Sequence, residues 1–181
     1  MLQVNKNNFW IVALVLAVVM SVTRVGHFGE AGGPPDASWA VFFLAGMWLR
    51  TFKLFPAFFL FAWIADMTAF ALGTPTNCYT LAYLFLIPAY AALWCAGCWV
   101  AQQQFKPLAL VSALLGSALT TFVVANLGMF WLSPSPTSAS FVDFSVAVAG
   151  YFPGYLLTMS VYVAAAVAFA AALRFKRLAS E

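Results

Sequence analysis

Long runs of apolar residues, broken only by short polar connections, dominate this chain of 181 residues. One run, from Leu108 to Leu132, holds no charged side chain, and several exceed the roughly 18 apolar residues that mark a membrane-spanning helix. Only 7% of the residues are charged and the mean hydropathy is +0.95, whereas soluble domains carry about 25% charged residues. So few charges cannot cover a water-facing surface. The sequence therefore predicts an all-α integral membrane protein, with residues 1–181 forming a single transmembrane domain.

Six apolar segments are expected to form six transmembrane helices in one bundle. Their expected limits are about 9–25, 38–52, 53–72, 79–104, 108–132 and a last segment within 141–175. The last region is too long for one straight span of about 20 residues. Gly150, Pro153 and Gly154 predict that its first part is separate or kinked. The N-terminal apolar run is interpreted as a retained helix, because no small-residue cleavage site follows it.

Basic residues predict the orientation, because cytoplasmic connections of membrane proteins are enriched in Lys and Arg. Six spans with both termini in the cytoplasm leave only Arg24 outside and place seven basic residues inside: Lys6, Arg50, Lys53, Lys106, Arg174, Lys176 and Arg177. The net charge of +3 thus relates to topology and does not indicate a nucleic-acid partner. The outer connections are GHFGEAGGPPDA, TPTNC and SPSPTSAS, and we expect the functional site among them.

Cys78 and His27 are the candidate metal ligands, because both are expected on the outer side of the membrane. A thiolate suits soft or borderline metals, and histidine is a common ligand of transition metals. A lone cysteine cannot make a structural zinc site, which needs four ligands. An incidental free thiol and a solvated loop histidine remain the alternatives.

Asp66 is the one acid deep in an apolar segment, WIADMTAF, where a charge is costly and faces the bundle interior or a cavity. It is expected to line an outward-facing pocket or to serve as a structural hydrogen-bond hub. Cys95 and Cys98 form a C-x-x-C pattern within another apolar segment. Small neighbours favour helix packing there over redox chemistry.

Two further patterns concern surfaces. Six aromatic residues are expected near the outer end and are suited to wall a pocket for a large flat ligand: Phe28, Trp39, Tyr79, Tyr83, Phe141 and Tyr151. Ala13 and Ala17 form a small-x-x-x-small pattern that fits either internal packing or docking of another membrane protein. No phosphate-binding glycine motif, H-E-x-x-H or G-x-S-x-G is present, and no internal repeat supports an inverted-repeat carrier.

These features together resemble the substrate-binding S-components of energy-coupling-factor (ECF) vitamin transporters, which are small six-span proteins with both ends in the cytoplasm. Ala13 and Ala17 match the A-x-x-x-A face with which such proteins meet a transmembrane coupling subunit and its ATPases. Within that group the chain is similar, over essentially its full length, to the BtuM family of solitary cobalamin transporters of the Gram-negative inner membrane. The residues that carry this resemblance are His27, Asp66 and the TPTNCY stretch with Cys78.

The resemblance implies that Cys78 ligates the cobalt of a corrinoid, cobalamin or cobinamide, from the side that the dimethylbenzimidazole base vacates. A thiolate donor weakens the bond trans to it, so removal of an upper cyanide through Cys78 is an implied side activity. The pocket would face the periplasm. His27 would stabilise the thiolate or hydrogen-bond the ligand, and Asp66 would anchor a polar edge of the ligand or orient the neighbours of Cys78. Asn77 and Tyr79 flank the cysteine.

Two other function classes remain open. A membrane redox enzyme acting on quinone or haem would use Cys95 and Cys98, or His27 as an axial ligand. A single histidine, and a C-x-x-C without a following histidine, disfavour haem. A structural or assembly protein would use its aromatic and alanine-rich faces only for packing. The colour of the purified protein separates a corrinoid-binding protein from a haem or quinone enzyme. A thermal shift with a small ligand tests whether the chain is instead a structural or assembly protein.

Overall fold

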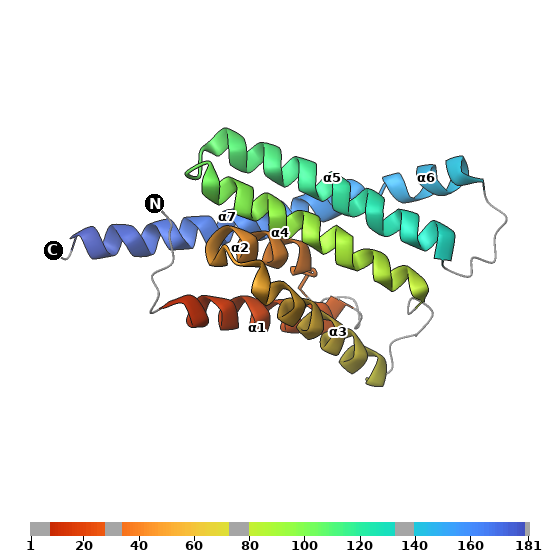
Figure 1. Ribbon diagram of the computed structural model, residues 1–181, viewed down its shortest axis with the longest axis horizontal. Helices are drawn as coiled ribbons and strands as arrows, with labels where there is room; N and C mark the ends of the chain where they lie inside the picture. The colour runs from red at the N-terminus through yellow and green to blue at the C-terminus, as the bar shows by residue number, and fades with distance from the viewer. Residues whose placement is uncertain (1–7, 28–33, 73–79, 133–139, 180–181) are drawn as a thin grey trace.

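The computed structural model describes residues 8–27, 34–72, 80–132 and 140–179, and these residues form helices and short connections without any strand (Figure 1). The helices are α1 (Phe9–His27), α2 (Ser38–Leu49), η2 (Phe52–Leu54), α3 (Phe55–Ala71), η4 (Leu81–Phe85), α4 (Leu86–Gln102), α5 (Pro107–Leu132), α6 (Phe141–Ala149) and α7 (Phe152–Ala179). The all-α prediction is confirmed for this part of the chain.

Four helical segments are long and apolar enough to cross a membrane: Phe52–Ala71, Leu81–Gln102, Pro107–Leu132 and Phe152–Leu173. The apolar parts of α1 and α2 are shorter. With 12 residues, α2 rises about 18 Å, against about 30 Å for the hydrocarbon core of a bilayer. Length and composition therefore indicate a membrane-embedded protein. By these criteria the described residues contain four spans, so the prediction of six is not confirmed.

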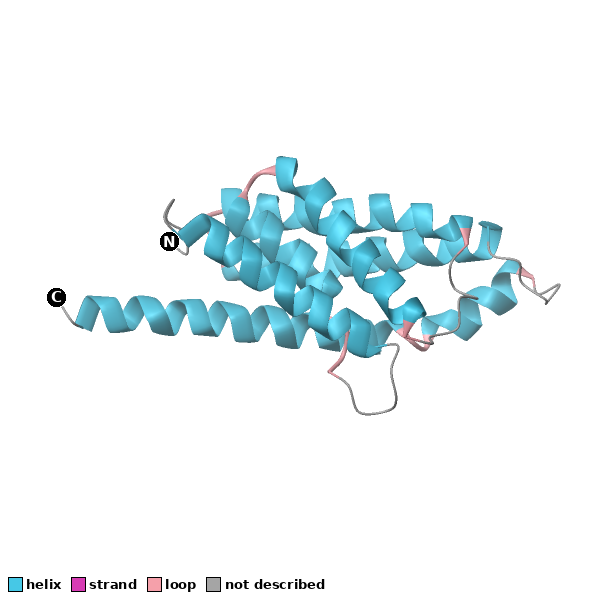
Figure 2. Cartoon of the chain, turned by 90° about the horizontal axis from the view of Figure 1, so that it is seen from below, coloured by secondary structure: helices cyan, strands magenta, loops and turns pink. Residues whose placement is uncertain are grey.

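The helices run back and forth along one long axis (Figure 1). α1 begins and α7 ends at the same end of the bundle, and α7 extends beyond the other helices there (Figures 1 and 2). A break at Gly150 and Tyr151 separates the short α6 from α7. This confirms the predicted division of the last apolar region, and Pro153 lies in the first turn of α7, where a missing N–H costs nothing.

The central helix is α2, which packs against α1, α4 and α7. Ten of its 12 residues are buried, as expected for a helix that is apolar on every side. Its Phe42 belongs to an aromatic cluster around Trp94 of α4, in which Phe55 and Phe58 of α3 present ring edges at centroid distances of 5.8 and 5.5 Å. This cluster joins three helices around one buried indole ring.

Two glycines allow α2 and α4 to cross with their backbones in contact. A Cβ atom on Gly46 would collide with the carbonyl oxygen of Trp94, and one on Gly97 would collide with the carbonyl oxygen of Phe43. Helices in membranes pack closely where small residues meet in this way. The prediction of close helix packing beside the C-x-x-C pattern is confirmed at Gly97.

The small-residue face of α1 lies inside the bundle. Ala13 and Ala17 are only 8% and 7% exposed and belong to the hydrophobic core, where α1 packs against α3 and α2. The chain's own helices therefore cover the face that these two alanines form. This burial favours the internal-packing alternative for Ala13 and Ala17, and docking of a coupling subunit there stays a prediction.

Thr121 links two helices through a buried side-chain hydrogen bond, since its Oγ1 donates to the carbonyl oxygen of Ala89 at 2.9 Å. We expect Thr121→Val to lower the free energy of unfolding by about 1 kcal/mol, because the shape is kept and the interhelical bond is lost. Thr120→Val is the matched control, since Thr120 is exposed and donates only to Gly116 of its own helix. Thermal unfolding in detergent measures both. Equal losses in the two variants would contradict the interhelical role.

Candidate functional site

Arg24, near the carboxyl end of α1, is buried and pairs with Asp66 of α3. Its Nε donates to Oδ1 of Asp66 at 2.6 Å, and its Nη2 donates to Oδ2 at 2.8 Å. The side chains of the two residues are 6% and 1% exposed. This planar, two-point geometry is the strongest form of an Arg–carboxylate contact. The basic residue expected outside is thus the partner of the acid found deep in an apolar segment.

The remaining donors of the guanidinium reach three other elements. Nη1 donates to the hydroxyls of Ser38 and Tyr90, each at 2.9 Å, and lies 3.4 Å from Oδ2 of Asp36. Nη2 also lies 3.4 Å from the hydroxyl of Tyr83. The centre of the guanidinium is 5.8 Å from the centroid of the Tyr90 ring. We call this set of side chains the Arg24 network: Arg24, Asp36, Ser38, Asp66, Tyr83 and Tyr90.

Asp36 lies two residues before α2 and completes the network on its exposed side. Its Oδ1 accepts hydrogen bonds from the backbone N–H of Ser38 at 2.9 Å and from the Ser38 hydroxyl at 2.6 Å. An Asp side chain that bonds to the backbone two residues later favours a turn of this kind. The hydroxyl of Thr23 accepts from the N–H of Ala37 at 3.1 Å. Local polar contacts therefore hold the end of α1 against the start of α2.

The network contains one cation and two carboxylates, so its formal charge is negative when all three groups are ionised. A buried charge is tolerated only when it is paired and hydrogen-bonded. Both oxygens of Asp66 accept from Arg24, which is the arrangement of a structural hydrogen-bond hub. Direct contact between Asp66 and a ligand stays a prediction. Asp36, with a 21% exposed side chain, is the carboxylate nearest to solvent.

The structure brings only some of the predicted site residues together. Asp66 and Tyr83 meet at Arg24. Trp39, next to Ser38, is half-buried and stacks on Tyr155 of α7 with ring centroids 4.9 Å apart. Phe141 packs edge-on against Phe130 of α5, and Tyr151 is 67% exposed. The predicted aromatic wall is therefore divided between the region of the network and the separate segment of α6.

Several predicted residues lie outside the described part of the chain. These are Phe28, Asn77, Cys78 and Tyr79. His27 is the last residue of α1, and its side chain is not described. Among the described residues, no three His, Cys, Asp or Glu side chains come together. The roles of Cys78 and His27 as ligands remain predictions.

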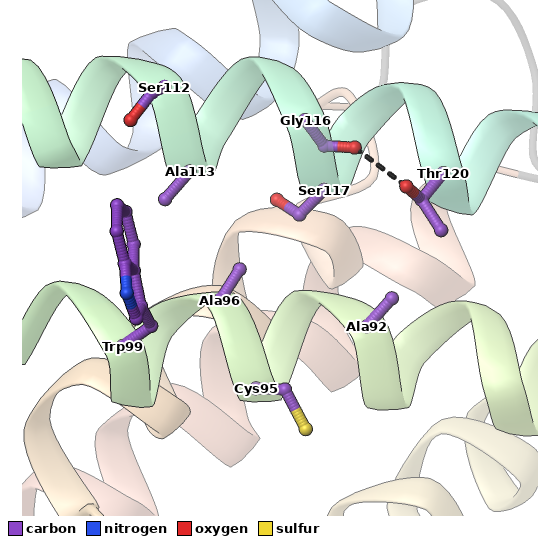
Figure 3. A pocket seen from close by; sticks show the side chains of 9 residues that line it. All are labelled: Ala92, Cys95, Ala96, Trp99, Ser112, Ala113, Gly116, Ser117 and Thr120. Carbon is purple, nitrogen blue, oxygen red and sulfur yellow. Dashed lines mark hydrogen bonds between the residues drawn. The ribbon is translucent and has the colours of Figure 1, made fainter.

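The two cysteines of the C-x-x-C pattern are both free and lie in different environments. Cys98 is half-buried, and its Sγ donates to the carbonyl oxygen of Gly46 at 3.3 Å. Cys95 is exposed beside a shallow groove of about 530 Å³ between α4 and α5, lined mostly by small side chains. Figure 3 shows the sulfur of Cys95 pointing away from α5. These contacts fit the packing interpretation for Cys98.

Arg24, Asp36, Ser38 and Tyr90 were not among the predicted site residues. One signal in the sequence could have found Arg24. Arg24 is a cation at the end of one apolar segment, and Asp66 is an anion within another. Opposite charges in apolar segments tend to pair with one another, which suggests Arg24 as the partner of Asp66. Ser38 and Tyr90 carry no comparable signal, because uncharged hydroxyl residues are common in helices of any membrane protein.

No protein-family model matches this chain, and no curated protein matches it. The fold and the site define an all-α protein of membrane type, with a buried guanidinium–carboxylate network at one end of its bundle.

Proposed function

We propose that the chain is a corrinoid-binding uptake protein of the ECF S-component type, similar to the BtuM family. In this proposal six helices cross a bacterial inner membrane, with both termini in the cytoplasm. The binding site faces the periplasm, and cobalamin is the transported substrate. Cys78 supplies a thiolate that binds the corrin cobalt.

One observation carries the proposal: the Arg24 network joins described residues that stand, in the sequence, before and after the candidate ligands His27 and Cys78. Arg24 precedes His27 by one helical turn, and Cys78 lies in the connection between Asp66 and Tyr83. Arg24 contacts both Asp66 and Tyr83. A ligand-binding constellation works best on rigid supports with satisfied hydrogen bonds. The network is a support of that kind among the described residues on either side of Cys78 in the sequence.

The distribution of charge supports the proposed orientation. Arg50 is in the turn after α2, and its Nη2 donates to the carbonyl oxygen of Ala101 at 3.1 Å, with its guanidinium over the ring of Phe105. This contact brings the α2–α3 turn beside the α4–α5 turn, so Lys53 and Lys106 belong to the same end. The carboxyl end of α1, which carries Arg24, lies at the other end of the bundle from the α4–α5 turn (Figure 1). A basic end of this kind is typical of the cytoplasmic side.

A cysteine ligand suits a substrate of this class. Cobalamin is large and amphipathic, with amide-bearing edges around a metal centre, so aromatic walls alone would hold it loosely. A single sulfur–cobalt bond adds affinity and fixes the orientation of the corrin ring. Thiolates are also the deprotonated, ligating form of cysteine, so binding through Cys78 releases or displaces a proton from that thiol.

A visible absorption titration tests the proposal. We expect aquocobalamin added to corrinoid-free protein in detergent to give a saturable shift of the corrin bands. Cys78→Ala is expected to lose that shift and to bind at least about tenfold more weakly, which corresponds to about 1.4 kcal/mol. Cys95→Ser is the matched control, because it removes a free exposed thiol on a helix apart from the outer connections.

A shift that persists in Cys78→Ala would remove the cysteine as ligand, and His27→Ala would then be the next variant. A wild-type protein that neither changes the corrin spectrum nor gains thermal stability from aquocobalamin would contradict the proposed function itself.

A further inference from the structure

One guanidinium contacts residues on both sides of two separate connections. The first connection, 28–33, follows Arg24 itself and precedes Asp36 and Ser38. The second, 73–79, follows Asp66 and precedes Tyr83. All four of these partners lie within hydrogen-bond reach of Arg24, at 2.6 to 3.4 Å. A single side chain therefore links the described residues that flank the two connections.

Only an arginine can make this set of contacts. Its guanidinium holds five N–H donors in one rigid plane, and it stays charged at every pH at which proteins are folded. Two edges of the guanidinium bond to different elements. Nε and Nη2 donate hydrogen bonds to Asp66 of α3, while Nη1 donates to the hydroxyls of Ser38 of α2 and Tyr90 of α4. A lysine ammonium is a point charge and would satisfy one of these directions at a time.

Burial makes the geometry of the contacts strict. Arg24 and Asp66 are almost fully removed from solvent, so a lost partner leaves a charged group in a site with little access to bulk water. Buried ion pairs are weak sources of net stability, and their best attested use is to select one arrangement of the surrounding elements. The arrangement selected here is the relative position of the ends of α1 and α3 and the starts of α2 and η4.

We propose that Arg24 is a positioning residue that holds the flanks of connections 28–33 and 73–79 in one fixed relation, so that substrate meets a preorganised site. The effect on substrate rests on the function proposed above. The fixed relation between the flanks does not, because it concerns described residues and is measurable without any corrinoid.

Pulsed EPR measures that relation directly. Spin labels are placed at Pro34→Cys and Leu81→Cys, two exposed positions within two residues after the two connections, in a chain with its three native cysteines replaced by serine. The reference protein is expected to give a narrow distance distribution. We expect Arg24→Lys to broaden that distribution about twofold, because the ammonium keeps the charge but not the fork of donors.

Two controls and one milder variant keep the experiment decisive. Arg50→Lys makes the same change at the other end of α2, where Arg50 contacts Ala101, and is expected to leave the distribution narrow. Ser38→Ala removes only one arm of the network and is expected to broaden it in a protein that folds. Ser117→Ala is its control, because Ser117 is also buried but donates its hydrogen bond to Leu114 within its own helix.

A folded Arg24→Lys protein with the narrow reference distribution would overturn the proposal. If Arg24→Lys does not fold, Ser38→Ala decides in the same way. A titration with aquocobalamin in the native-cysteine background then tests the link to the substrate, with about tenfold weaker binding expected for Arg24→Lys and none of that loss for Arg50→Lys. Equal affinities beside a broadened distribution would also overturn it. Absence of corrinoid binding to the wild-type protein would contradict only the proposed function.

Discussion

Asp66→Ala is expected to lower the free energy of unfolding by about 3–5 kcal/mol, the cost of leaving one member of a buried ion pair without its partner. The Arg24 guanidinium cannot lose its proton, and its side chain is only 6% exposed. Two hydrogen bonds, at 2.6 and 2.8 Å, disappear together with the carboxylate. Asp36 would remain as a counter-ion, but at 3.4 Å from Nη1 it replaces neither of them.

Denaturant unfolding in detergent micelles, followed by tryptophan fluorescence, measures this loss. Asp143→Ala is the matched control: Asp143 is exposed at the start of α6, where it contacts the cap residue Ser140. Loss of such a cap contact costs about 1 kcal/mol. Losses of the same size in both variants would show that Asp66 is not in a buried pair.

The double variant Arg24→Met/Asp66→Leu separates stability from positioning. Replacing a buried ion pair by apolar side chains of similar volume is often neutral or stabilising, so this protein should recover most of the stability that Asp66→Ala loses. It lacks the donors that reach Ser38 and Tyr83, so the distance distribution between labels at positions 34 and 81 should stay broad. Recovered stability with a narrow distribution would assign the network a structural role alone.

The helices were predictable from the sequence because their causes are local. Apolar runs with few charges leave no alternative to helices in a bilayer, where each backbone polar group must be satisfied within its own segment. The break before α7 follows from Gly150 and Pro153, which disfavour a continuous helix at their own positions. The limits of the first five predicted segments agree with the structure to within a few residues, with one exception. The fourth segment was expected to begin at about residue 79, but α4 begins at Leu86 and the short helix η4 precedes it.

The contacts between helices were less predictable, because they depend on which faces meet. The pattern of Ala13 and Ala17 fitted both an internal and an external face, and only the packing of α1 against α2 and α3 distinguishes them. Asp66 could be predicted as a site residue because it is a charge in an apolar segment. Its partner Arg24 is 42 residues away in sequence, and no periodicity in either segment relates the two positions.

Gly97→Ala is expected to destabilise the protein by about 3 kcal/mol, at the upper end of the usual cost of overpacking. The added methyl group would meet the backbone carbonyl of Phe43, and not the end of a flexible side chain that could turn away. The two helices would have to separate, which would also stretch the hydrogen bond from Cys98 to Gly46. Gly116→Ala is the matched control, since its Cβ would meet nothing within 4 Å.

In Gly116→Ala the intrinsic preference of alanine for helices should leave the protein unchanged or stabilise it by up to about 1 kcal/mol. Opposite signs in the two variants, measured by thermal unfolding in detergent, would establish that the backbones of α2 and α4 are in contact at Gly97. Because α2 also carries Ser38 of the Arg24 network at its other end, Gly97→Ala should also change the distance between labels at positions 34 and 81. Equal stability of the two variants would mean that α2 and α4 lie farther apart than the structure places them.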